Sequence, residues 1–171
     1  MLCSCSSSVT TTLPRPKATK DILILGVGNI LQGDDGIGIR VVEMLTQECL
    51  PSGVCVADAG TPGLELPLWL EGWERVIIID AVHMGELPGT WRRFGPDEVR
   101  LIASDKALSL HELDLANGLA LAQNLDMLPK EIIFYGMEPE RIEWGQELSP
   151  AIEAALPGLL EDLKAELRKR E

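Results

Sequence analysis

The sequence predicts an α/β fold in which helices cover both faces of a mainly parallel sheet. Short apolar runs alternate with stretches whose apolar residues recur at helical spacing, which is the pattern of consecutive strand–helix units. The apolar runs have the character of strands that are buried on both faces. With 171 residues, of which 46% are hydrophobic, the chain is large enough for one domain with a continuous core.

The first unit consists of a strand, a glycine-rich turn and a helix. Residues 22–25 are consecutive apolar residues, a run too short for a helix. Gly26, Gly28, Gly33 and Gly36 follow closely and give the backbone freedom to turn sharply. A helix is then predicted from apolar residues at helical spacing, namely Ile37, Val41, Met44 and Leu45.

Two adjacent acids, Asp34 and Asp35, lie inside this turn. A strand, a glycine loop and a helix normally form a nest for an anion. However, Leu31 stands where a dinucleotide fingerprint needs its third glycine. Two carboxylates in a tight loop suit a hard or borderline cation better. The alternative is that one or both acids simply cap the following helix.

The later elements follow the same alternation. Further strands are predicted at 54–57, 75–79, 90–94 and 131–135, and further helices at about 63–70, from 109 or 111 onward, and from 150 onward. The short helix should turn Leu64, Leu68 and Trp69 toward the core. The strand at 90–94 carries two arginines, which is typical of an edge strand with one solvated face.

Three acids follow the ends of predicted strands. Asp35 comes after the first strand, Asp58 closes the second and Asp80 closes the third. In parallel sheets a ligand binds beyond the carboxyl ends of the strands. A single aspartate at such a place is commonly a helix cap or a turn former. Three in succession beside a glycine loop favour a binding site.

The chain has two histidines, His83 and His111. His83 lies in a loop rich in glycine and proline, where an exposed residue without a special role is expected. His111 stands at the start of a predicted helix, where it is either a structural histidine or a ligand aimed at the sheet. Together with Asp35 and Asp80 it would form a set of two carboxylates and one imidazole that fits nickel, zinc or iron and leaves coordination positions open.

Common hydrolase motifs are absent from the sequence, which contains no HExxH, no GxSxG and no P-loop. A nucleophilic pair formed by Cys55 and His111 is conceivable, but Cys55 lies in an apolar strand where a thiolate is disfavoured. The net charge of -12 argues against binding to nucleic acid or to an anionic membrane. The four cysteines form no CxxC pair, so a reducing, cytoplasmic location is expected.

Several segments, taken together and in order, resemble the nickel-iron hydrogenase maturation endopeptidases. They are residues 25–38 (LGVGNILQGDDGIG), 58–65 (DAGTPGLE), 79–81 (IDA), 109–111 (SLH), 138–139 (EP) and 148–150 (LSP). The resemblance extends from about residue 21 to the final helix. It implies one α/β peptidase domain at 21–171. Residues 1–20 lie outside the resemblance and are rich in serine and threonine, so we expect them to form a disordered tail.

The resemblance implies an endopeptidase that removes a C-terminal extension from the hydrogenase large-subunit precursor after nickel insertion. It assigns Asp35, Asp80 and His111 as ligands of nickel, which the substrate supplies and another divalent metal may replace. It assigns a part in substrate choice to Asp58, Gly60 and Thr61. The implied fold has three layers, α/β/α, and a five-stranded sheet of order 2-1-3-5-4 whose fourth strand is antiparallel.

Two positions depart from the family pattern. Asp35 replaces a residue that is often glutamate and is one methylene shorter, and Ala59 replaces a usual glycine. Asp34 is either a catalytic base or, as we favour, a helix cap. The rival interpretations are a non-proteolytic domain that binds a metal or a nucleotide, and an assembly chaperone that binds the precursor without cutting it.

Overall fold

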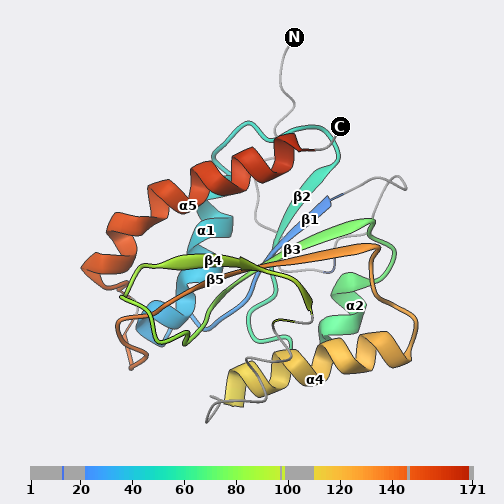
Figure 1. The fold of residues 1–171 in the computed structure, drawn as a ribbon, viewed down its shortest axis with the longest axis horizontal. Coiled ribbons are helices and arrows are strands. Elements are labelled where there is room, and N and C mark those ends of the chain that lie inside the picture. The colour runs from blue at the N-terminus through green and yellow to red at the C-terminus, as the bar shows by residue number, and fades with distance from the viewer. Residues whose placement is uncertain (1–12, 14–21, 97, 99–109, 146, 170–171) are drawn as a thin grey trace.

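The computed structural model describes residue 13 and residues 22–96, 98, 110–145 and 147–169, and of residues 110–114 only the backbone (Figure 1). The expected tail at 1–20 therefore lies outside the described residues, apart from Leu13. Within the described part of the chain, no helix is both long enough and apolar enough to span a membrane.

A five-stranded sheet forms the middle layer, in the order β2-β1-β3-β5-β4. All neighbouring pairs are parallel except β4, which runs antiparallel to β5 at the edge of the sheet. The order and the reversed edge strand confirm the prediction. The strands are β1 (Ile22–Gly26), β2 (Val54–Asp58), β3 (Arg75–Ala81), β4 (Trp91–Phe94) and β5 (Glu131–Met137).

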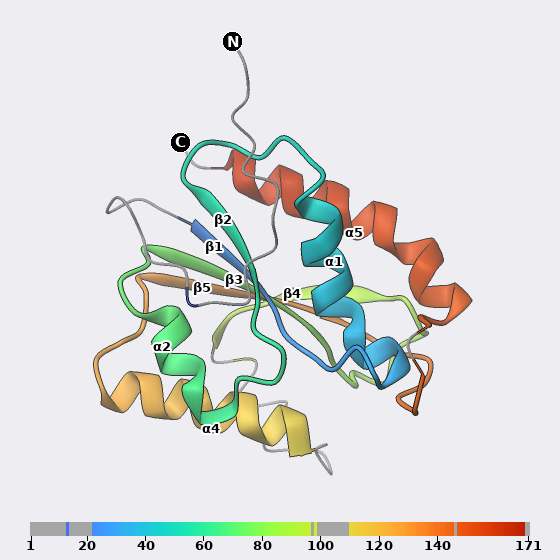
Figure 2. The same cartoon turned by 180° about the vertical axis from the view of Figure 1, so that it is seen from behind.

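Helices cover both faces of this sheet, as Figures 1 and 2 show from opposite sides. α1 (Ile37–Leu45) and α5 (Pro150–Arg168) lie on one face, whereas α2 (Leu66–Leu70) and α4 (Leu110–Asn124) lie on the other. Short 3₁₀ turns precede two of the helices: η1 (Gly33–Gly36) leads into α1, and η2 (Gly63–Glu65) leads into α2.

The strands are apolar along their length because alternate side chains enter two different cores. Ile22 and Ile24 point to the core beneath α1 and α5, whereas Leu23 and Leu25 point to the core beneath α2 and α4. β3 and β5 alternate in the same way. The predicted three-layer architecture is therefore confirmed at the level of individual side chains.

One predicted helix face was wrong. Trp69 is buried as expected, but Leu64 and Leu68 are 67% and 50% exposed, and the residues that reach the core are instead Leu66, Pro67 and Leu70. Residues 63–65 form a 3₁₀ turn before α2 begins. Because a 3₁₀ turn has about three residues per turn rather than 3.6, it shifts the angular phase of everything after it.

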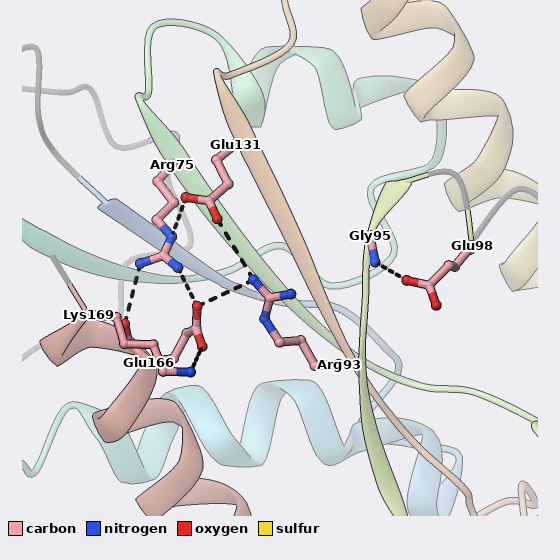
Figure 3. Close-up of polar contacts among 7 residues, drawn as sticks. All are labelled: Arg75, Arg93, Gly95, Glu98, Glu131, Glu166 and Lys169. Carbon is pink, nitrogen blue, oxygen red and sulfur yellow. Dashed lines mark hydrogen bonds and ion pairs between the residues drawn. The ribbon is translucent and has the colours of Figure 1, made fainter.

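An ion-pair network fastens the end of α5 to the amino ends of β3 and β5 (Figure 3). Arg75 pairs with the buried carboxylate of Glu166, and its Nε lies 2.9 Å from Glu131 Oε2. Glu166 also accepts Lys169 Nζ at 2.9 Å and lies 3.5 Å from Arg93. Burial raises the pKa of Glu166, but these cations outweigh it and hold the pKa below its usual value.

Candidate active site

Four connections leave the carboxyl edge of the sheet, because β1, β2, β3 and β5 are parallel and end on the same side. These connections span residues 27–32, 59–62, 82–90 and 138–149. All the acids that the sequence singled out lie in or beside them. The carboxyl edge is therefore where any site made of these residues must form.

Two glycines let the turn after β1 pack closely against the ends of the strands. A Cβ on Gly28 would lie 1.8 Å from the carbonyl oxygen of Asp35, and one on Gly38 would lie 2.3 Å from the carbonyl oxygen of Ile79. Only a hydrogen fits at either place. Because of this close approach, η1 and the first turn of α1 lie against β3. The backbone of Asp35 therefore lies near the end of β3, which carries Ile79 and Asp80.

Asp35 and Asp80 are both buried, with 5% and 3% of their surface exposed. Oδ2 of Asp35 accepts the backbone N–H of Asn29 at 2.8 Å, and Oδ1 of Asp80 accepts the N–H of Ala81 at 2.8 Å. Buried carboxylates persist only with hydrogen bonds, a counter-charge or a metal. Both groups lie at the carboxyl edge of the sheet, and they are the two acids of the predicted ligand set.

Asp34 has a different task from the one predicted. Its oxygens accept both the N–H and the Oγ–H of Ser149, at 2.7 and 2.8 Å, and the N–H groups of Glu140 and Arg141 at 2.9 and 3.0 Å. Among the described residues no side chain caps η1 or α1. The cap interpretation was therefore wrong for α1: Asp34 instead binds Ser149, the N-cap residue of α5, across more than a hundred residues.

The loop after β2 is tied to the glycine turn. Asp58 Oδ1 accepts the N–H of Gly60 at 2.7 Å, and the carbonyl of Gly60 accepts the N–H of Gly28 at 2.8 Å. Gly60 has a φ of 55°, in the left-handed region that favours glycine. Thr61, the third residue assigned to substrate choice, follows on the exposed side. The three residues thus border the same corner as Asp35.

His111 belongs to α4, but its side chain lies outside the described residues. α4 has 15 residues, hence a length of about 22 Å, and it ends six residues before β5 begins at the amino edge. Its first turn therefore lies toward the carboxyl edge, as Figure 1 shows. Among the side chains that the structure describes, no three of the types His, Cys, Asp and Glu are grouped to hold a metal. The predicted three-residue set stays a prediction.

Sequence reasoning assigned no role to Glu138, although it lies in a segment that carries the family resemblance. Its buried carboxylate accepts the N–H groups of Met84 and Glu86 at 2.6 and 3.1 Å and lies 3.3 Å from His83 Nδ1. Burial raises the pKa of Glu138, but these hydrogen bonds outweigh it and lower the pKa below its usual value. Glu138 thereby fastens the loop after β3 to the end of β5.

Comparison with known proteins decides the family. The sequence profile described as hydrogenase maturation protease matches residues 39–166. The chain is also 39% identical over 150 residues to the hydrogenase 2 maturation protease of Escherichia coli K12, covering 86% of this chain and 91% of that protein. The chain belongs to the hydrogenase maturation proteases. It is accordingly a peptidase.

Solved structures agree with this family assignment. The hydrogenase maturating endopeptidase HybD from E. coli superposes with a TM-score of 0.79 at 38% identity, over 87% of this chain and 93% of that one. The [NiFe] hydrogenase maturation protease HybD from Thermococcus kodakarensis superposes with a TM-score of 0.72 at 30% identity, over 86% and 99%. The fold of this maturation protease is therefore the fold of its solved relatives.

Proposed function

We propose that this maturation protease removes the C-terminal extension of a nickel-iron hydrogenase large-subunit precursor after nickel has been inserted. The observation that carries the proposal is the burial of two carboxylates, Asp35 and Asp80, at the carboxyl edge of the sheet. The names of the relatives support the substrate class, since they are hydrogenase maturation proteases and one is named as a [NiFe] hydrogenase maturation protease. We expect the reaction to take place in the cytoplasm.

Nickel belongs to the substrate in this proposal and acts as the recognition element. Carboxylate and imidazole donors suit nickel and other borderline divalent cations, so the side chains that would hold it are Asp35, Asp80 and His111. Bound nickel would supply Lewis-acid polarisation of a nearby carbonyl or water. Asp58, Gly60 and Thr61 border this corner and would contact the peptide to be cut.

Asp34 is excluded as the catalytic base by its hydrogen bonds. Its two oxygens accept four of them, and it has no measurable exposure to solvent. A base must reach the proton that it abstracts, within hydrogen-bond distance or through one water. Asp34 therefore acts by holding the glycine turn and α5 together.

The test uses the two histidines as a matched pair. Purified wild-type, His111→Ala and His83→Ala chains are mixed with nickel-loaded precursor, and the mass of the precursor is followed. We expect wild type and His83→Ala to release the extension and His111→Ala to release none while unfolding at the wild-type temperature. Normal cleavage by His111→Ala would refute the ligand assignment.

A second measurement tests the recognition role of nickel. Precursor prepared without nickel should stay uncut under conditions in which nickel-loaded precursor is cut completely. Efficient cutting of nickel-free precursor would mean that this protease does not recognise the nickel of its substrate. A stable complex with no change of precursor mass would instead indicate an assembly chaperone.

A further inference from the structure

Four exposed apolar side chains gather on two neighbouring segments of the carboxyl edge. Single exposed apolar residues are normal on protein surfaces, but a group of them is typical of an interaction site. Ile30 and Leu31 in the glycine turn are 50% and 40% exposed, and Ile142 and Trp144 in the connection to α5 are 37% and 81% exposed. We call these four residues the rim patch.

The two segments of the rim patch are bonded to each other through their backbones. The N–H of Gly145 donates to the carbonyl of Leu31 at 3.0 Å, and the carbonyl of Gly145 accepts the N–H of Gly33 at 2.7 Å. In both Figure 1 and Figure 2 the connection before α5 runs beside the start of α1. Trp144 therefore extends into solvent from a fixed backbone, and such preorganisation lowers the entropy lost on binding.

The surroundings of the rim patch indicate the chemistry of its partner. A hollow of about 190 Å³ lies next to it, lined by residues that include Ile30, Arg40 and Leu148. The connection that carries Trp144 also carries three exposed acids, namely Glu140, Glu143 and Glu147. Glu143 already pairs with Arg141 at 3.4 Å, whereas Glu140 and Glu147 add to the acidic border. The complementary surface is apolar at its centre and basic at its rim.

We propose that the rim patch is the surface on which the folded body of the large-subunit precursor docks, with Trp144 as its anchor. The inference rests on the proposed function. The patch includes part of the glycine turn that carries Asp35, so a protein bound there would have its chain end delivered to the same corner. Tryptophan is one of the residue types enriched among the few side chains that dominate interface energy.

The test compares Trp144→Ala with Leu125→Ala in the precursor-cutting assay. Leu125 is also exposed, at 54%, but it follows α4 on the way to the amino edge of the sheet. We expect Trp144→Ala to raise KM by about 30-fold, the effect of losing one interface hot spot, with the loss falling on KM rather than on kcat. Leu125→Ala should keep the wild-type KM, and both variants should unfold at the wild-type temperature.

The outcomes separate this inference from the proposed function. A wild-type KM for Trp144→Ala overturns the docking surface and leaves the protease assignment in place. If wild type itself does not cut, the proposed function fails, and sedimentation of each chain with uncut precursor then tests the docking surface. Loss of the complex in Trp144→Ala alone would support the docking surface. Equal binding by wild type and Trp144→Ala would overturn it. Self-association of wild type that Trp144→Ala abolishes would show a second copy of the chain as the occupant, and would also overturn the inference.

Discussion

The hydrogen bonds of Asp34 give the sharpest prediction of stability. An Asp34→Asn substitution keeps the size of the side chain but leaves one acceptor oxygen where there were two. The best orientation puts that oxygen at the position of Oδ2, where it still meets Glu140, Arg141 and the hydroxyl of Ser149. The amide NH₂ then faces the N–H of Ser149, which donated to Oδ1 at 2.7 Å, so two donors oppose each other in a buried place.

The expected loss follows from these contacts. A buried donor left without an acceptor costs about 1–3 kcal/mol, and each of the other three hydrogen bonds weakens by about 1 kcal/mol when its acceptor loses its charge. Allowing for non-additivity, we expect the free energy of unfolding to fall by about 4 kcal/mol, a large part of the 5–15 kcal/mol typical of a domain. For a chain of this size that lowers Tm by about 8–16 °C.

The assay is thermal unfolding followed by circular dichroism, with Asp35→Asn as the matched control. Asparagine at position 35 can keep the hydrogen bond from Asn29 through its amide oxygen, so we expect a decrease in Tm of less than about 4 °C. The same substitution should abolish precursor cutting. A Tm for Asp34→Asn within about 2 °C of wild type would refute the argument, because it would mean that the four hydrogen bonds contribute little.

Three further predictions concern buried groups. Glu166→Gln should lower the free energy of unfolding by about 3 kcal/mol, because it removes the buried negative charge that pairs with the guanidinium of Arg75, and urea unfolding measures the loss. Gly38→Ala should be destabilised by at least about 2 kcal/mol, because its Cβ would lie 2.3 Å from a strand carbonyl that cannot move aside. A stability equal to wild type would contradict the close packing of α1 against β3. The pKa values of Glu138 and Glu166 are lower in the folded protein than the 4.5 of the unfolded chain, so both carboxylates stabilise the fold above pH 4.5. This stability is lost as the pH falls through the pKa values of the folded protein. Tm should therefore fall below about pH 4.5 in wild type and fall less steeply in Glu166→Gln.

Local patterns were sufficient to predict most elements of this fold. The apolar run of β1, the glycines after it and the helical spacing from Ile37 onward each depend on neighbours in sequence, and each element formed close to its predicted position. The face of α2 was wrong because a 3₁₀ turn at residues 63–65 changed the phase, and apolar spacing alone does not reveal such a turn.

The hydrogen-bond partner of Asp34 could not be predicted from local sequence patterns. Ser149 is 115 positions away, and only the folded sheet brings the two together. The two adjacent acids also look alike in sequence, yet Asp34 bonds to the connection before α5 whereas Asp35 bonds to the N–H of Asn29 in its own turn. The strand-end rule correctly gathered Asp35, Asp58 and Asp80 at one edge, whereas the orientation of His111 remains a prediction.

The direction of α5 has a practical consequence for the design of fusion proteins. Its 19 residues extend over about 28 Å, from the side of Asp34, which binds Ser149, to the amino ends of β3 and β5, where Glu166 pairs with Arg75. A purification tag or fluorescent reporter fused after that helix would lie far from the carboxyl edge, where we propose that cleavage takes place. Such fusions should therefore report on encounter with the precursor without obstructing it.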